Sequence, residues 1–447
     1  MPQVSVPWGQ TQCTISLPED WTVEQVADSL LRPAPEDWAD RLALVLGQPG
    51  TGLSLEKLLA ARPGGRIVVV VEDVTRHSPL PQILGVVMRE LEHCRVGRER
   101  IEFVFATGMH TPMSDAQAAE KLGPAADGVA WRCNPWQRPD AYVSVGRCEG
   151  VDIQIDRGVA TADLRILVSS VSPHLQAGFG GGYKMLIPGC ASLQTIRHLH
   201  RRGLGRTFRQ WVGTDGVHNP MRRLIDGAGA MIDEHHGASF ALQYLLDEAD
   251  LPSSVAAGDV LPTQRMLAKQ CAVACGVLVN EPGDVVIANA HPRDFDLWQS
   301  FKCIPNTLWA ARRDGVVICL TRCPAGVHGM SFPRIGLSSA WMRRLLRWLG
   351  PGAFASLVIR LLPQLASDAA FFVRLATQAL RRNPIFMVSA ELAGAGVRFP
   401  GVEIFPSPEP AIDAARAILG DGPQSVVVFP AGGITYPVPP GQSQGAP

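Results

Sequence analysis

The sequence has 447 residues, 46% of them hydrophobic, and its 41 basic and 41 acidic side chains leave no net charge. This is an ordinary globular composition with room for two or three domains, and the lack of a basic excess disfavours a dedicated nucleic-acid-binding protein. No secretory signal opens the chain, and its most apolar helical stretch, residues 353–380, is interrupted by charged residues and a proline. We therefore expect a cytoplasmic protein without a membrane span.

The predicted elements alternate between strands and helices along most of the chain. The first 17 residues predict two short strands around Trp8 and Gly9, and Thr22–Leu31 predicts a helix. Apolar, β-rich runs bounded by turn residues then predict six strands, at Arg66–Val71, Ile101–Ala106, Leu164–Ser169, Val285–Ala290, Gly315–Leu320 and Ser425–Phe429. Helical patterns occupy Leu80–Leu91, Ala116–Leu122, Ser338–Leu349, Phe354–Arg381 and Ala411–Leu419.

This alternation predicts the fold class. Nearly continuous apolar strands that alternate with helices are typical of α/β domains with largely parallel sheets and flanking helices. We expect two such domains, at 1–280 and 281–435, followed by a flexible tail at 436–447. We also expect the active site to lie in the cleft between the two domains.

Polar side chains follow four of the predicted strands, where ligands of open α/β sheets bind. They are Asp73, Arg76, His110, His174, Gln299 and Lys302. Arg76 can bind a substrate carboxylate through two parallel hydrogen bonds, and the alternative is a turn with a local Asp73–Arg76 ion pair. Gln299 and Lys302 lie three residues apart on one face of a predicted helix, where they form either a second carboxylate clamp or a solvated surface.

A glycine-rich segment precedes Lys184, one of only five lysines in the chain. Glycines at 178, 180, 181 and 182 allow the backbone to approach a ligand closely. The segment lacks the Gly-Lys-Ser/Thr ending of a phosphate-binding P-loop and the spacing of a dinucleotide-binding fingerprint. The alternative is a flexible surface loop, but a lysine kept in an arginine-rich chain favours an amine that can lose its proton and react.

The histidines offer candidates for proton transfer and for metal binding. His110 and His174 follow strand ends directly, which suits general acids and bases. His198 and His200 alternate on a predicted helix, so they face different ways and cannot both bind one metal there. The chain has neither an HExxH motif nor a Cys/His zinc spacing, so most ligands of any bound metal would come from outside a compact protein motif.

Taken together, these motifs resemble those of the lactate racemase family over about residues 1–330. The resemblance rests on Asp73-x-Thr75-Arg76, Gly108-x-His110, Pro173-His174, Gly181-Gly182-x-Lys184, Pro188-Gly189-x-Ala191-Ser192, His200 and Gln299-x-x-Lys302. The segment from Pro173 to His200 is the most specific part. Members of this family use the nickel-pincer nucleotide, pyridinium-3-thioamide-5-thiocarboxylic acid mononucleotide.

The resemblance implies a role for each matched residue. Lys184 would carry the nickel-pincer nucleotide through a thioamide, and His200 would be the protein ligand of Ni(II). His110 and His174 would be the paired acid/base groups. Arg76, Gln299 and Lys302 would hold the carboxylate of a small 2-hydroxy acid, supported by Asp73. The phosphate of the cofactor would rest on backbone N–H groups near Thr75 or in the loop formed by Gly178, Gly180, Gly181 and Gly182.

The implied activity is racemisation or epimerisation of a 2-hydroxy acid by hydride transfer through a 2-keto acid, with partner proteins that make and deliver the cofactor. Three positions depart from the family pattern: Gly180 where serine is common, Tyr183 where arginine is common, and Trp298 where lactate racemase has tyrosine. An NAD-type 2-hydroxy acid dehydrogenase is an alternative, disfavoured by the missing GxGxxG motif. A non-catalytic nucleotide- or nickel-binding relative is the other.

Overall fold

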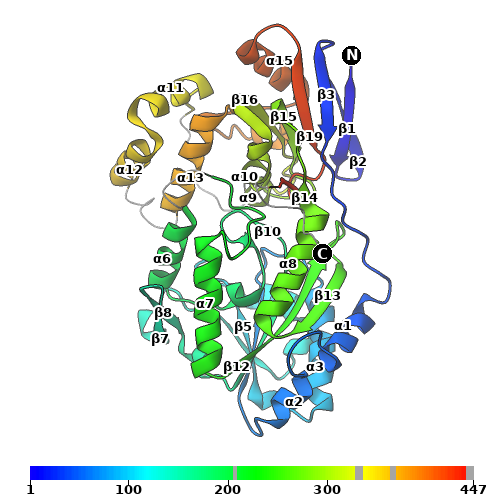
Figure 1. Cartoon of the computed structure of the whole chain (residues 1–447), viewed down its shortest axis with the longest axis vertical. Coiled ribbons are helices and arrows are strands. Elements are labelled where there is room, and N and C mark those ends of the chain that lie inside the picture. The colour runs from blue at the N-terminus through cyan, green and yellow to red at the C-terminus, as the bar shows by residue number, and fades with distance from the viewer. Residues whose placement is uncertain (205–208, 328–335, 363–368, 439–447) are drawn as a thin grey trace. The chain divides into compact units, whose positions relative to one another are not determined.

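The computed structural model describes residues 1–204, 209–327, 336–362 and 369–438. The chain divides into two compact units. The central unit, named for its place in the sequence, comprises Leu31–Gly205 and Thr214–Ala272. The terminal unit comprises Met1–Leu30, Arg206–Gly213 and Val273–Pro447, so it contains both ends of the chain. Figure 1 labels many of the elements of the two units.

The central unit is built on a six-stranded sheet in the order β13-β12-β9-β4-β5-β6. All neighbours in this sheet are parallel except β12 and β13, which are antiparallel. The strands are β4 (Ile67–Val71), β5 (Ile101–Phe105), β6 (Ala130–Cys133), β9 (Leu164–Ser170), β12 (Ala238–Leu246) and β13 (Pro252–Gly258). Two antiparallel pairs lie outside it, β7 (Tyr142–Cys148) with β8 (Val151–Asp156) and β10 (Pro173–His174) with β11 (Gly178–Phe179).

Helices cover both faces of this sheet. Val69 and Val71 of β4 join one hydrophobic cluster with α3, whereas Val68 and Val70 join a second cluster with α6 and α7. Because alternate side chains of a strand point to opposite faces, burial on both faces explains the unbroken apolar run. The helices are α1 (Trp38–Gly47), α2 (Leu55–Ala60), α3 (Leu80–His93), α4 (Asp115–Leu122), α5 (Arg157–Ala160), α6 (Leu193–Leu204), α7 (Pro220–His235) and α8 (Val260–Cys275).

The terminal unit contains a second six-stranded sheet, ordered β18-β17-β16-β15-β19-β3 and parallel throughout. Its strands are β3 (Trp21–Val26), β15 (Gly283–Asn289), β16 (Ala311–Leu320), β17 (Ile385–Val388), β18 (Val402–Phe405) and β19 (Gln424–Phe429). Two two-stranded pairs accompany it, β1 (Gln3–Trp8) with β2 (Thr11–Ser16) and β14 (Gly276–Val277) with β20 (Tyr436–Pro437).

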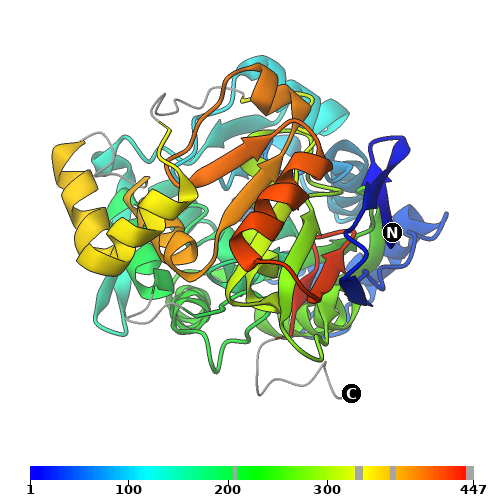
Figure 2. The ribbon, with the colours of Figure 1, turned by 90° about the horizontal axis from the view of Figure 1, so that it is seen from above.

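Helices also pack on both faces of the second sheet. Helix α15 belongs to one hydrophobic cluster, and α10, α11 and α13 belong to the other; Figure 2 shows α15 against the strands. The helices are α9 (Leu297–Ser300), α10 (Cys303–Thr307), α11 (Ser339–Leu349), α12 (Pro351–Leu361), α13 (Ala369–Arg382), α14 (Ala390–Gly394) and α15 (Pro408–Leu419). The α/β class with largely parallel sheets and flanking helices is therefore confirmed.

Near the N-terminus, one predicted helix is wrong. Thr22–Leu31 was expected to be helical, but Trp21–Val26 forms strand β3, which pairs in parallel with β19. Burial alternates along β3, with Trp21 buried and Thr22 exposed, as in a strand with one covered and one exposed face. Met1–Leu30 consequently packs with the terminal unit, whereas the sequence placed it in a domain spanning 1–280.

Near the C-terminus, two of the residues expected to form a tail belong to a strand, which pairs with β14. Tyr436 and Pro437 form β20, and Tyr436 is buried. Residues 439–447 of the expected tail lie outside the described residues. The predicted helix Phe354–Arg381 corresponds to α12 and α13, and its residues 363–368 also lie outside the described part. Among the described residues, no helix is long and apolar enough to cross a membrane.

Candidate active site

The ends of β4 and β5 bring Asp73 and His110 together. These strands are parallel neighbours, so the segments that follow them emerge at the same sheet edge. His110 Nδ1 lies 2.7 Å from Asp73 Oδ2. The other oxygen of Asp73 accepts hydrogen bonds from the backbone N–H and the hydroxyl of Thr75, at 3.0 and 2.5 Å.

This pairing determines the ionisation of Asp73 and the tautomer of a neutral His110. Burial alone would raise the pKa of Asp73, but the hydrogen bond and charge of His110, helped by Arg76 and Thr75, hold that pKa well below its usual range. An ionised Asp73 can only accept, so Nδ1 of His110 donates to it. The neutral ring of His110 then carries its lone pair on Nε2, which is the form a general base needs.

His174 is held in the opposite tautomer, because its Nδ1 accepts hydrogen bonds where that of His110 donates one. It lies in β10, and its Nδ1 accepts hydrogen bonds from the backbone N–H groups of Gln176 and Ala177, at 3.3 and 3.0 Å. The neutral ring therefore carries its proton on Nε2 and presents a donor. The tight turn depends on Gly178, whose φ is +75° and where a Cβ would stand 1.8 Å from the carbonyl oxygen of Thr214.

Lys184 is a half-buried lysine among cations. Burial, followed by the charges of Arg76 and Arg222, lowers its pKa from 10.5 to about 7, against an opposing effect of Asp73. Within the described part of the chain, its amine has neither a hydrogen-bond acceptor nor a carboxylate partner within bonding distance. Near neutral pH, much of this amine is therefore uncharged and able to act as a nucleophile.

His200 lies on helix α6 and is also half-buried. Burial, then the charges of Lys184 and His110, lower its pKa to about 4. A neutral imidazole is the form that binds metals. His198, two residues earlier, lines a surface pocket together with Arg197 and Arg201 instead. Across residues 1–204, 209–327, 336–362 and 369–438, no three His, Cys, Asp or Glu side chains converge into a metal site.

The glycine-rich loop packs against the protein itself. The backbone N–H of Gly180 donates to Ser172 O at 2.7 Å, and that of Gly182 donates to Gln243 Oε1 at 3.1 Å. Gly181 and Gly182 have φ values of +70° and +66°, and a Cβ at either position would overlap Gln243 or Gln264. These glycines allow the close packing that presents Lys184, and at least two of the loop's amides are engaged within the protein.

In the terminal unit, Gln299 and Lys302 contact each other, although Lys302 lies just beyond the end of helix α9. Asp296 caps the short helix α9 by accepting from the Gln299 backbone N–H at 2.7 Å. Lys302 Nζ donates to Gln299 Oε1. The ring of Trp298 packs edge-on against Phe372, with centroids 5.0 Å apart.

Comparison with known proteins shows which family the chain resembles. The family model described as "Lactate racemase N-terminal domain" matches residues 8–210. The lactate racemase of Thermoanaerobacterium thermosaccharolyticum is 24% identical over 345 residues, which cover 75% of this chain and 78% of that protein. The lactate racemase of Lactiplantibacillus plantarum is 25% identical over 287 residues, covering 62% of this chain and 64% of that protein. Over residues 8–210 the chain is therefore similar to the lactate racemase family.

Solved structures share the fold. The lactate racemase apoprotein from Thermoanaerobacterium thermosaccharolyticum superposes with a TM-score of 0.77 at 19% identity, covering 97% of this chain and 99% of that chain. A crystal structure of a Thermotoga maritima protein gives a TM-score of 0.59 at 19% identity, covering 90% and 98%. The lactate racemase fold therefore extends past residue 330, where sequence motifs gave no alignment.

The chemistry of several residues in the central unit fits a covalently attached cofactor. Lys184 supplies an amine with a pKa of about 7, and His200 supplies a neutral imidazole. Gln243 Nε2 and Gln264 Oε1, which lie against the glycine loop, are buried and have no hydrogen-bond partner among the described residues. Buried polar atoms without partners are rare in native proteins, and a bound polar group would satisfy them.

One departure from the family pattern has a structural explanation. Tyr183 replaces the arginine common in the family, and its hydroxyl donates to Asp233 Oδ2 at 2.6 Å. A Cβ on Gly229 of α7 would stand 2.0 Å from the Tyr183 ring, so that glycine makes room for it. Tyr183 therefore anchors the Lys184 loop to α7. The structure offers no explanation for Gly180 in place of serine.

The sequence motifs did not identify Arg222, which binds the glycine-rich loop through hydrogen bonds from helix α7. Arg222 is buried on α7 and donates to the carbonyl oxygens of Ala177, Phe179 and Gly181. It also pairs with Asp226 at 3.4 Å. The sequence does contain a sign of this role: Arg222 lies on the apolar face of an amphipathic helix, between Met221 and Leu224. Its charge is one cause of the lowered pKa of Lys184.

Proposed function

We propose that this chain is a racemase of small 2-hydroxy acids that uses the nickel-pincer nucleotide attached at Lys184, with His200 as the protein ligand of Ni(II). The observation that carries the proposal is the mutual influence of Lys184, His200, His110 and Arg76, whose charges affect one another in the central unit. When bound, the cofactor supplies a hydride acceptor, so the substrate passes through a 2-keto acid. Proteins that make and deliver this cofactor are the expected partners.

His110 and His174 would exchange the hydroxyl proton of the substrate. With Asp73 on Nδ1, His110 offers the lone pair of Nε2 and takes the hydroxyl proton of one enantiomer. His174 offers Nε2–H, which hydrogen-bonds to the substrate oxygen. For the opposite enantiomer the two roles exchange, which requires His174 Nδ1 to give up its backbone hydrogen bonds and carry the ring proton, so that Nε2 is free to accept one.

Three residues would hold the substrate carboxylate. Arg76 provides the fork geometry that binds a carboxylate with two hydrogen bonds. Gln299 and Lys302, which already contact each other, would add two further donors. Trp298, with Phe372 behind it, would contact an apolar substituent on C2 of the substrate. Asp73 would support Arg76, since the charge of Arg76 already acts on it.

Racemisation in D2O tests the proposed reaction. Hydrogen that leaves C2 as hydride does not exchange with water, so we expect the product to keep its original C2 hydrogen. Substrate deuterated at C2 should likewise keep its deuterium in H2O, and racemisation should need no added NAD. Extensive solvent deuterium at C2 would instead establish direct proton abstraction and overturn the proposal.

A further inference from the structure

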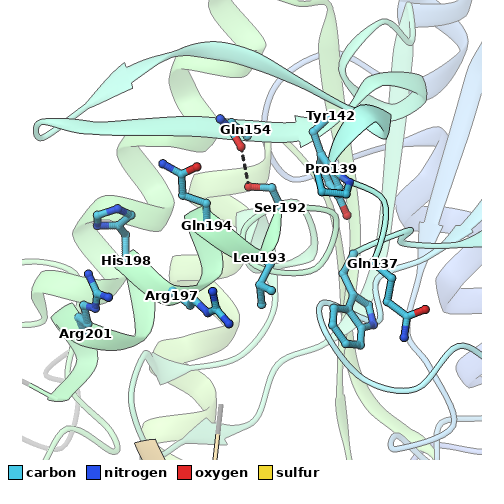
Figure 3. Close-up of a pocket in the computed structure, with 11 residues that line it drawn as sticks. Gln137, Pro139, Tyr142, Gln154, Ser192, Leu193, Gln194, Arg197, His198 and Arg201 are labelled. Atoms are coloured by element: carbon cyan, nitrogen blue, oxygen red, sulfur yellow. Dashed lines mark hydrogen bonds between the residues drawn. The ribbon is translucent and has the colours of Figure 1, made fainter. Parts of the chain in front are cut away.

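A concave pocket of about 730 Å³ lies beside helix α6 in the central unit. Its walls come from α6, from the β7–β8 hairpin and from the loop that contains Trp136 and Pro139, and Figure 3 shows the residues that line it. We call it the α6 pocket. None of the residues proposed above to hold cofactor or substrate lines it, so its chemistry needs a separate account.

The α6 pocket carries a concentrated positive charge. Arg197 and Arg201, which lie four residues apart on α6, supply this charge, His198 lines the pocket beside them (Figure 3), and no aspartate or glutamate does. In the described ranges, none of the three has an ion-pair partner. The adjacent Arg202, which does not line the pocket, pairs with Glu149. Uncompensated cations in a concave site attract an anion.

Aromatic rings form the other wall of the pocket. Trp136 Nε1 donates to the backbone oxygen of His110 at 2.9 Å, and the Tyr142 hydroxyl donates to Asn134 Oδ1 at 3.0 Å. Because these polar atoms are engaged elsewhere, the rings offer the pocket mainly their apolar surfaces. Ser192 and Gln154 are joined at 2.9 Å, as the dashed line in Figure 3 shows.

We propose that the α6 pocket binds a phosphate monoester that carries a flat ring. Two arginines match the double negative charge of a phosphate better than the single charge of a carboxylate, and His198 adds a hydrogen-bonding group. A planar ring would pack against Trp136 and Tyr142, as bases do on aromatic side chains. The pocket volume is within the range of small-molecule sites, about 300–1,000 Å³. This site is independent of the proposed racemase function.

Calorimetric titration of the full-length, cofactor-free protein with phenyl phosphate tests the site. We expect one binding event whose Kd rises at least about tenfold in the Arg197→Gln/Arg201→Gln double variant, because two charge-assisted contacts are lost. Arg89→Gln is the matched control: Arg89 is exposed on α3, lies outside the pocket and has no ion-pair partner in the described chain. This control should leave the Kd unchanged.

Two further probes separate the contributions of charge and ring. Benzyl alcohol, which lacks the charge, and inorganic phosphate, which lacks the ring, should each bind at least about tenfold more weakly than phenyl phosphate. The Arg197→Lys/Arg201→Lys variant keeps both charges and should retain binding, which excludes misfolding as the cause of loss in the glutamine variant. No binding of phenyl phosphate, equal binding by the glutamine variant, or equal binding of either probe would overturn the proposal.

Discussion

Lys184 and Lys302 are two of the chain's five lysines, and both are half-buried. Lys302 donates to Gln299, whereas Lys184 has no such acceptor among the described residues. The charges of Arg76 and Arg222 contribute to the lowered pKa of Lys184. A lysine with an acceptor is suited to bind an anion, and a half-buried lysine beside other cations gives up its proton near neutral pH. The difference in surroundings, more than the residue type, separates the proposed attachment site from the proposed substrate clamp.

Exchanging each lysine for alanine should have the largest effects, and the two effects should differ in kind. Lys184→Ala should abolish the covalent cofactor adduct in protein co-produced with the cofactor-making enzymes, because no other amine occupies that position. Lys302→Ala should keep the adduct and lose substrate affinity. Intact-mass spectrometry measures the adduct in both variants. An adduct that persists in Lys184→Ala would assign attachment elsewhere.

The surroundings of Lys184 also include His200, whose replacement should affect the metal. His200→Ala should remove most bound nickel and leave the organic adduct in place, since metal ligation and covalent attachment use different residues. His198→Ala, on the same helix but facing the α6 pocket, is the control and should retain nickel. Elemental analysis together with intact mass distinguishes the two outcomes. Nickel retained in His200→Ala would point to a different ligand.

Neither lysine transfers the substrate's hydroxyl proton in this scheme, so the histidines should control turnover. Replacing His110 or His174 by alanine should reduce racemisation in both directions about 10²–10⁴-fold, the usual contribution of a general acid or base. Initial rates from each enantiomer, measured with protein of equal cofactor content, give the comparison. A loss smaller than roughly tenfold would show that the histidine concerned had been misassigned.

The smallest predicted effect concerns the stability of the cofactor-free protein. Because the pKa of Lys184 falls from 10.5 to about 7 on folding, the unfolded chain binds the extra proton between these values. The charged amine therefore costs stability fully below pH 7, by a few kcal/mol at most, and the cost disappears as pH rises towards 10.5. Lys184→Met should stabilise the protein more at pH 6 than at pH 9 in urea unfolding.

The exposed Lys57 on helix α2 provides the control for that measurement. Lys57→Met should change the free energy of unfolding little, and by the same amount at both pH values, because surface substitutions away from special contacts have small effects. A gain from Lys184→Met that does not depend on pH would mean that its amine keeps an ordinary pKa in the folded protein.

Sequence patterns predicted several strands that are buried on both faces, but missed the equally buried β12 and the edge strand β3. Val68–Val71 is apolar throughout because helices cover both sides of its sheet. Strand β3 is an edge strand with exposed alternate residues, and its partner β19 begins about 400 residues later, so local periodicity could not identify it. Strands β17 and β18 have four residues each, too few for a clear pattern.

The site shows the same division between local and distant information. Asp73 and His110 could be expected to meet, because both follow parallel strands at one sheet edge. The tautomers of His110 and His174 could not be predicted, since these depend on which atoms face Nδ1 in three dimensions. Arg222 could not be assigned to the Lys184 loop either, because the loop accepts its hydrogen bonds through backbone oxygens that carry no sequence signal.

The pairing of β3 with β19 also has a consequence for the order of events during synthesis. The 31–272 part of the chain contains a complete sheet of its own, which can form as soon as that part leaves the ribosome. Strand β3 emerges before the central unit but finds its partner only after about 400 more residues are translated, roughly 20–80 s later at 5–20 residues per second. For that interval the β3 segment must remain unpaired while the central unit folds around its own core.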